Sequence, residues 1–287
     1  MSKYAYLGPV GTFTEAALRT ITGGSDQLTP CSNVTAALDM VRTGSADFAL
    51  VPIENSVEGV VARTLDELAT GEPLIIVGEV KKIATHPHAE AQCRNYIAKH
   101  YPNAEIITTN STAAAAEALA NGQFDAAVAS EVAAKTYGLT IINENIGDAE
   151  SAVTRFVLVS KPGALPAPTG FDRTSLAAFI GIDHAGALLE VLTEFAVRGV
   201  NLTFIQSRPT GRELGHYHFI IDAEGHINDA RVGDALTGLR RICEDIRFLG
   251  SYPRADKVAP TTSKVTSDES FKSSNNWLED VRKGRAI

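Results

Sequence analysis

Residues Lys161–Asp172 have the sequence K-P-G-A-L-P-A-P-T-G-F-D and divide the chain into two parts with different patterns. The segment has three prolines, two glycines and no apolar periodicity, which is the composition of a linker between folded parts. The 287 residues are enough for two domains, at ~150 residues each. We therefore expect one domain over residues 1–160, a linker over 161–172 and a second domain over 173–256.

Before the linker, short β-like runs alternate with helical stretches. The clearest run is F-A-L-V-P-I at Phe48–Ile53, which has the pattern of a buried strand. The expected strands lie at residues 3–7, near 28, at 48–53, 74–80, 106–108, 126–129, 140–142 and 155–159, and the expected helices at 14–21, 34–42, 63–69, 88–100, 113–120 and 132–137. Such alternation with short connections predicts an α/β domain with parallel sheets flanked by helices.

After the linker, the pattern changes to strand-helix-strand-strand-helix-strand. The strands are expected at residues 175–180, 202–207, 216–221 and 246–249, and the helices at 186–197 and 229–239. This order is typical of the ferredoxin-like α+β fold. Small modules of this shape commonly pair side by side, so we expect a homodimer or a homotetramer.

The last 31 residues, 257–287, form a polar tail. Eight of the 19 residues at 257–275 are Ser or Thr, and this composition predicts a disordered or loosely draped segment. Trp277, Leu278 and Val281 then form a short apolar stripe, which predicts a short C-terminal helix docked on a neighbouring surface.

The composition excludes several classes of protein. Lys and Arg number 26 and Asp and Glu number 34, giving a net charge of −8, and an acidic chain is a poor candidate for binding nucleic acid. No apolar run reaches the ~20 residues that span a bilayer, and the N-terminus lacks the apolar stretch of a signal peptide. Cys31, Cys93 and Cys243 have neither metal-site nor disulfide spacing. We therefore expect a cytoplasmic protein with reduced thiols, no membrane partner and no bound metal.

Small polar side chains recur where strands of the first part are expected to run into helices. They are Thr12, Asn55 and Ser56, Ser111 and Thr112, and Ser130. Helix N-termini at one edge of a sheet can together bind an anion, although ordinary N-capping selects the same residue types. The segment contains neither of the glycine-rich nucleotide-binding patterns.

Charged residues offer weaker candidates for a site. Arg155 begins a strand and would bind a carboxylate if it faced the same edge, but a surface position is equally compatible with the pattern. Glu54 and Glu58 form a possible acid–base pair, and His86 and His88 could reach a metal, but neither pair has supporting spacing.

Ordered motifs along the chain carry a resemblance to a known family. Y-L-G-P-V-G-T-F-T-E-A-A, V-P-I-E-N-S-V-E-G-V-V, S-T-A-A-A and T-R-F, in this order and spacing, resemble prephenate dehydratase. G-A-L-L-E-V-L, N-L-T-F-I-Q-S-R-P and L-G-S-Y-P resemble the regulatory ACT domain that follows in that family. The resemblance implies a two-lobed catalytic domain shaped like a periplasmic binding protein, followed by the ferredoxin-like ACT domain.

The resemblance also implies an activity and its residues. The reaction is the conversion of prephenate to phenylpyruvate in phenylalanine biosynthesis, without a cofactor, since aromatisation of the ring drives it. Thr154 matches the catalytic threonine, and the substrate-binding positions are Thr12, Asn55, Ser56, Ser111, Thr112, Ser130, Arg155 and Phe156. The positions that bind the inhibitor L-phenylalanine between subunits are Ala185, Gly186, Ala187, Leu188, Asn201, Gln206, Ser207, Arg208 and Pro209.

Three positions depart from the family pattern. The connection from Val80 to Thr85 is shorter than in the family, Ala152 replaces a common Asn, and Gln206 replaces a Glu. We expect regulation by phenylalanine to persist, because the G-A-L motif and Asn201 are present. Two alternative functions stay open: an arogenate dehydratase, and a non-catalytic two-lobed binding or sensor protein.

Overall fold

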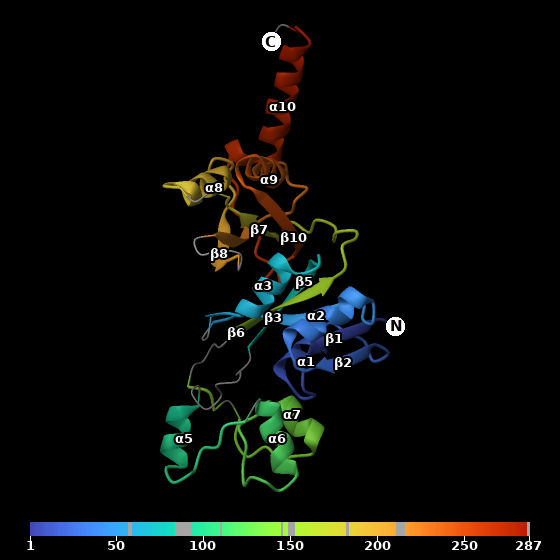
Figure 1. The fold of residues 1–287 in the computed structure, drawn as a ribbon, viewed down its shortest axis with the longest axis vertical. Coiled ribbons are helices and arrows are strands. Elements are labelled where there is room, and N and C mark those ends of the chain that lie inside the picture. The colour runs from blue at the N-terminus through green and yellow to red at the C-terminus, as the bar shows by residue number, and fades with distance from the viewer. Residues whose placement is uncertain are drawn as a thin grey trace. The chain divides into compact units, whose positions relative to one another are not determined.

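The computed structural model describes residues 1–56, 59–83, 93–109, 111–144, 146–148, 153–181, 184–210 and 216–285. Contacts between residues divide the chain into two compact units. The first unit contains Met1–Leu65 and Glu79–Lys161, and the second contains Asp66–Gly78 and Pro162–Ile287. Figure 1 shows the helices and strands of both units.

A mixed sheet with strand order β2-β1-β3-β6-β5 forms the centre of the first part, with β4 paired to β3. Its strands are β1 (Lys3–Leu7), β2 (Gln27–Cys31), β3 (Phe48–Asn55), β4 (Gly59–Val60), β5 (Ile75–Ile83) and β6 (Val153–Ser160). The helices of this part are α1 (Phe13–Leu18), α2 (Val34–Thr43), α3 (Ala62–Thr70), α5 (Arg94–His100), α6 (Thr112–Ala120) and α7 (Glu131–Tyr137). Buried Tyr6, Leu18, Leu50 and Phe156 pack in one core cluster on this sheet.

The expectation of parallel sheets is correct for only part of this sheet. Strand β1 pairs in parallel with both β2 and β3, but β3 pairs antiparallel with β6 and with β4. Strand β6 lies at the end of this part of the sequence and pairs with β3. Local periodicity does not predict a pairing between strands so far apart in the sequence.

Three expected strands, at residues 106–108, 126–129 and 140–142, are wrong. The structure gives these residues no strand. Ile107 is 59% exposed and Ile142 70% exposed, whereas Val128 is half-buried. An apolar run becomes a strand only where a neighbouring strand pairs with its backbone and another layer covers one face. In the described ranges none of these segments pairs with a strand, and those at 106–108 and 140–142 are exposed.

The second unit contains a four-stranded antiparallel sheet with strand order β10-β7-β9-β8. The elements follow the expected strand-helix-strand-strand-helix-strand order: β7 (Asp172–Phe179), α8 (Ala187–Ala196), β8 (Leu202–Pro209), β9 (Tyr217–Glu224), α9 (Ala230–Ile242) and β10 (Asp245–Pro253). Leu176, Ile221, Phe195 and Leu239 form the core cluster between one face of the sheet and the two helices. The alternation of these strands therefore sends Phe179 and His218 to the opposite face.

The tail is more ordered than its composition predicts. A short 3₁₀ helix, η1 (Lys264–Thr266), is followed by α10 (Asp268–Arg282), so the loosely draped segment expected over 257–275 is partly helical. Ser267 caps α10 by accepting a hydrogen bond from the amide of Ser270, and Asp268 and Glu269 lie in its first turn. These residues favour helix initiation despite the low apolar content. Trp277 is 54% exposed on this helix.

Residues 161–171 form neither helix nor strand, and Asp172, the last residue of the expected linker, begins β7. All three cysteines are buried free thiols, and burial raises the pKa of Cys243 to about 11. No helix of the described ranges has both the length and the apolar composition needed to cross a membrane.

Candidate active site

Thr154 and Asn55 form a buried polar pair on adjacent strands. The register of β3 and β6 places Asn55 opposite Thr154, and the two side chains are only 5% and 4% exposed. The Asn55 amide Nδ2 donates to Thr154 Oγ1 at 2.9 Å. Since the Thr154 oxygen accepts this bond, its own hydroxyl hydrogen points elsewhere, toward a different acceptor. The pair can therefore present one oriented O–H donor.

Ser56 continues this strand end rather than starting a helix, which corrects the expectation for Asn55 and Ser56. The Ser56 amide donates to the carbonyl of Val153, and the Val153 amide donates to Ser56 Oγ, each at 2.9 Å. These bonds extend the ladder next to Thr154, and α3 begins only at Ala62. Asn55 and Ser56 are thus held by strand pairing.

Arg155 is buried and forms an ion pair with Glu79 of β5. The guanidinium Nε donates to Glu79 Oε2 at 2.9 Å, and Glu54 Oε2 lies 3.9 Å from Nη1. The Glu79 side chain is completely buried. A substrate carboxylate bound by Arg155 would therefore compete with an existing carboxylate partner.

Phe156 lies in the core cluster of the first unit and is 2% exposed. The structure therefore places this ring beneath the sheet rather than on an open surface. Its contacts with the core hold β6 in place two residues after Thr154.

The starts of α1 and α7 come together at the loop that precedes α1. Thr12 caps α1 by accepting a bond from the amide of Glu15, and Ser130 caps α7. Ser130 Oγ also donates to the carbonyl of Gly11 at 2.9 Å, which joins the two helix starts. Thr12 and Ser130 thus act as helix caps, the ordinary role of these residue types.

The buried Glu15 carboxylate stabilises the loop that precedes α1. It is 1% exposed, accepts a bond from the Gly11 amide at 2.6 Å and pairs with Arg19. Burial is the main cause that raises the pKa of Tyr6 well above its ordinary value, and the negative charge of the Glu15 carboxylate adds to the shift. The buried carboxylate lowers the positive potential that the α1 start would otherwise offer to an anion.

Ser111 and Thr112 begin α6, where Ser111 caps the helix by accepting a bond from the amide of Ala114 at 3.0 Å. The described hydrogen bonds of Ser111 are local to this turn. The structure therefore does not bring these two residues to Thr154 through direct contacts in the described ranges.

The first group of expected effector residues surrounds the start of α8. Gly186 is the N-cap residue with φ of +98°, a conformation that favours glycine. Ala187 is buried, whereas Ala185, Gly186 and Leu188 are exposed. Asn201 lies just before β8, and its carbonyl accepts a bond from the amide of Glu224.

The second group lies on β8. Gln206 donates from Nε2 to the carbonyl of Ser207, and Ser207 and Pro209 are exposed. Arg208 makes a two-point ion pair with Asp66 of α3, with Nε–Oδ1 and Nη2–Oδ2 distances of 2.8 and 2.6 Å. Arg208 therefore already holds a carboxylate within the chain.

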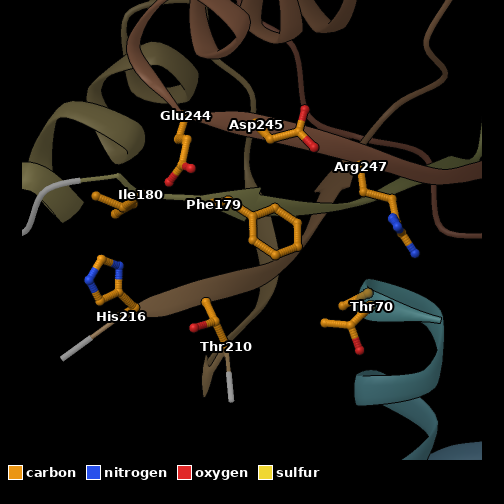
Figure 2. A pocket seen from close by; sticks show the side chains of 9 residues that line it. Thr70, Phe179, Ile180, Thr210, His216, Glu244, Asp245 and Arg247 are labelled. Atoms are coloured by element: carbon orange, nitrogen blue, oxygen red, sulfur yellow. The ribbon is translucent and has the colours of Figure 1, made fainter. Parts of the chain in front are cut away.

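A cavity of about 620 Å³ lies in the second unit, between the end of α3 and the face of the four-stranded sheet that the helices leave open. Figure 2 shows the Phe179 ring in its middle, with Thr70 and Arg247 on one side and His216 on the other. Its described lining contains none of the residues expected to bind substrate or effector. The described lining of the cavity and the Asn55–Thr154 pair therefore have no residue in common.

Within the described ranges, no group of three or more His, Cys, Asp or Glu side chains could hold a metal ion. Glu58, Thr85, His86, His88 and Ala152 lie outside the described residues.

Sequence reasoning missed the three carboxylates that hold the candidate site residues. The sequence does contain a pattern that indicates the role of Glu15, since Thr12 and Glu15 have the spacing of a capping box. Glu79 had a weaker one, as a charged residue within the apolar strand V-G-E-V. Asp66 had none, because its partner Arg208 is 142 residues away.

Two family models match the chain. The prephenate dehydratase model matches residues 4–82 and 77–164, and the ACT domain model matches residues 178–241. The two dehydratase segments overlap at residues 77–82, which includes the start of the Val80–Thr85 connection that departs from the family pattern.

Relatives match over nearly the whole chain. A prephenate dehydratase of Amycolatopsis methanolica is 46% identical over 302 residues, covering 99% of each protein. The crystal structure of the Arthrobacter aurescens prephenate dehydratase in complex with L-Phe is 48% identical, with a TM-score of 0.90 and coverage of 98% of this chain and 99% of that one. A structure described as a novel type of quorum quenching acylase is 30% identical, with a TM-score of 0.77 and coverage of 88% and 97%. The chain therefore belongs to the prephenate dehydratase family, with an ACT domain after the dehydratase segment.

Proposed function

We propose that this chain converts prephenate to phenylpyruvate, with loss of water and CO₂, and that L-phenylalanine inhibits it through the ACT domain. The observation that carries the proposal is the buried hydrogen bond from Asn55 to Thr154, in a chain whose full-length relatives are named prephenate dehydratase. A satisfied polar pair of this kind can hold a reactive hydroxyl in one orientation.

The reaction requires few functional groups from the protein. The bond from the ring to one carboxylate breaks, its electron pair moves into the ring, and the bond to the ring hydroxyl breaks at the opposite carbon. The products are CO₂, an aromatic ring and a hydroxide that must take up a proton to become water. Because aromatisation drives the reaction, the main requirements are to hold a dianion and to assist the departing hydroxide.

Thr154 is proposed as the residue that assists the departing hydroxide. Its Oγ1 accepts a hydrogen bond from Asn55, and its own O–H is proposed to donate to the leaving oxygen of the substrate. This bond strengthens as negative charge develops on that oxygen, which stabilises the transition state more than the ground state. Asn55 acts as a positioning residue for this donor.

The proposed substrate-binding set is retained from the sequence: Thr12, Asn55, Ser56, Ser111, Thr112, Ser130, Arg155 and Phe156. The amide groups at the starts of α1, α6 and α7 suit carboxylates, and the Ser130–Gly11 bond supports joint action of two of these starts. The Glu79 ion pair gives Arg155 a fixed orientation, and Phe156 supports β6 from the core.

The finer fold description is also a proposal. The strand order β10-β7-β9-β8 supports a ferredoxin-like ACT fold over residues 173–256, and we propose the two-lobed, periplasmic-binding-protein-like arrangement for residues 1–160. Residues 161–172 are proposed as the linker and 257–287 as the tail. We propose that the protein is cytoplasmic and works as a homodimer or homotetramer.

The effector site is proposed to take one group of residues from each of two subunits. The solved relative of Arthrobacter aurescens was crystallised with L-Phe. The start of α8 with Ala185, Gly186, Ala187 and Leu188 forms one group, and Asn201 with Gln206, Ser207, Arg208 and Pro209 forms the other. Gly186 leaves backbone amides open for an amino-acid carboxylate.

The test of the proposed activity is the Thr154→Ala variant. We expect kcat for phenylpyruvate formation from prephenate to fall at least ~10²-fold, the usual scale for a lost proton-transfer or hydrogen-bonding group, with little change in KM. Thr154→Ser is the matched control, since it keeps the hydroxyl and should retain most of the activity. A near-wild-type kcat for the Ala variant contradicts the assignment.

The wild-type chain should be assayed on three substrates: prephenate, arogenate and an acylated quorum-sensing signal. Prephenate turnover with the higher kcat/KM supports the proposal, whereas a preference for arogenate identifies an arogenate dehydratase. Hydrolysis of an acylated quorum-sensing signal without prephenate turnover would instead match the relative described as an acylase.

A further inference from the structure

The ion pair between Arg208 and Asp66 joins the effector strand β8 to helix α3. Both oxygens of the Asp66 carboxylate receive a bond from the same guanidinium, at 2.8 and 2.6 Å. A two-point pair between planar groups fixes orientation as well as distance. The Arg208 and Asp66 side chains are partly buried, at 24% and 36% exposure, so water screens the pair less than it would screen a fully exposed one.

The other end of α3 is tied to strand β3. Thr64, which is completely buried, donates from Oγ1 to the carbonyl of Pro52 at 2.6 Å, and the amide of Val61 donates to the carbonyl of Ile53. Strand β3 ends two residues after Ile53, at Asn55, whose amide group holds Thr154. Helix α3 is therefore anchored to the strand that carries the candidate active-site pair.

Helix α3 is nine residues long and includes residues of both compact units. Its first residues, Ala62–Leu65, belong to the first unit, and Asp66–Thr70 belong to the second. Leu65, Leu68 and Ala69 are buried, so the helix is packed along its length. A packed helix moves as a rigid body, and a shift at Asp66 reaches the bond between Thr64 and Pro52 within one turn.

We propose that Asp66 is a positioning residue that couples effector binding on β8 to catalysis, because the Arg208–Asp66 pair holds α3, and through it Asn55, in the active arrangement. This inference rests on the proposed inhibition by L-phenylalanine. The effector rearranges β8, weakens the pair and lets α3 move, and Asn55 then loses its alignment with Thr154. The signal therefore passes through a carboxylate that contacts neither substrate nor effector.

The experiment uses the full-length Asp66→Asn variant, which has nearly the same shape and lacks the charge. Three quantities are measured: kcat and KM for prephenate without effector, the extent of inhibition at saturating L-phenylalanine, and the binding of L-phenylalanine by calorimetry. Because the variant breaks the pair that holds α3 in the active arrangement, we expect kcat without effector to fall toward that of the inhibited wild type. Effector binding should stay within a few-fold of wild type, and the extent of inhibition should be at least ~5-fold smaller than in the wild type, the lower end of typical allosteric coupling.

The matched control is Asp234→Asn. Arg198 and Asp234 form a one-point ion pair in the same unit but outside α3 and β8, with an Nε–Oδ2 distance of 2.5 Å, and Arg198 also pairs with Glu194. This variant should respond to L-phenylalanine like the wild type. Asp66→Glu keeps the charge at a shifted position and should restore part of the inhibition, which a general loss of folding at this site would not allow.

The outcomes separate this inference from the proposed function. If Asp66→Asn is inhibited as strongly as the wild type, or if it no longer binds L-phenylalanine, the coupling role is overturned while the proposed activity stands. If the wild-type chain turns over prephenate but does not bind L-phenylalanine, the proposed regulation fails and the coupling role fails with it.

Discussion

At the scale of single residues, two buried polar side chains differ in how their polar atoms are satisfied. Thr154 is buried and accepts a hydrogen bond from Asn55, so its burial is compensated and its orientation is set. His218 is completely buried, and within the described ranges neither of its ring nitrogens has a hydrogen-bond partner. An uncompensated group of this kind lowers the stability of the folded state.

The His218→Leu variant tests this cost. Leucine has a similar volume and can contact the Phe179 ring, whose centroid lies 5.0 Å from the His218 ring. Removing two unpartnered nitrogens should stabilise the folded chain by about 1–3 kcal/mol. This raises the thermal midpoint at pH 7 by roughly 2–4 °C per kcal/mol. His226→Leu is the control and should destabilise, since His226 is buried with hydrogen bonds to Pro166 and Asn228.

The same variant should change how stability depends on pH. Burial lowers the pKa of His218 below its ordinary value of 6.5, Asp66 opposes this shift and Arg208 adds to it. Between the lowered value and 6.5, the unfolded chain binds a proton that the folded chain does not, so stability falls as the pH falls through 6.5. The midpoint of His218→Leu should decline less between pH 7 and pH 5 than that of the wild type. Parallel declines would show that His218 titrates alike in both states.

At the scale of elements, local signals were sufficient for some features. The caps at Thr12, Ser111 and Ser130 could be predicted because each helix start depends on residues within four positions. All six elements of the ACT domain follow from periodicity and turn residues, since consecutive elements of that fold are short and well separated.

Elements that depend on distant partners could not be predicted. The runs around Ile107 and Ile142 have strand-like composition, but they lack a pairing strand in the described ranges. The Arg155–Glu79 pair is equally hidden, since the two residues are 76 positions apart.

Strand β10 shows how one glycine allows a close approach between elements. Gly250 has φ of +143° at an irregularity in the pairing of β10 with β7, and an added Cβ would clash with the carbonyl oxygen of Ile76 in β5. Gly250→Ala should destabilise the chain by about 2–5 kcal/mol, because backbone strain and overpacking add. Thermal unfolding measures this loss.

Gly170→Ala provides the matched control for this substitution. Gly170 also has a positive φ, of +85°, but nothing lies within 4 Å of the added Cβ. It should cost only the ~1–2 kcal/mol of a left-handed alanine. Equal losses for the two variants would mean that the backbone of β10 moves away from Ile76 without further cost.

At the scale of the whole molecule, the net charge of −8 opposes a substrate that carries two carboxylates. Net charge acts at long range, whereas the field in the site depends on nearby groups. The charge of Arg155 is balanced by Glu79, so helix N-termini must supply much of the local attraction. Capture of the substrate is therefore expected to work against a repulsive long-range field.

This expectation predicts the effect of salt. Raising the ionic strength from about 0.01 M to about 0.1 M shortens the screening length from roughly 30 Å to 10 Å. The repulsion between the acidic chain and prephenate then weakens, while the short-range contacts at the helix starts are little affected. We expect kcat/KM for prephenate to rise by no more than a few-fold, and kcat to stay constant, when rates are measured across this range. Sodium chloride and potassium chloride should act alike, since screening depends on ionic strength and not on a specific ion. A steep fall in kcat/KM would instead mean that a basic surface steers the dianion into the site, and that the local field reaches farther than the paired Arg155 and the helix starts can account for.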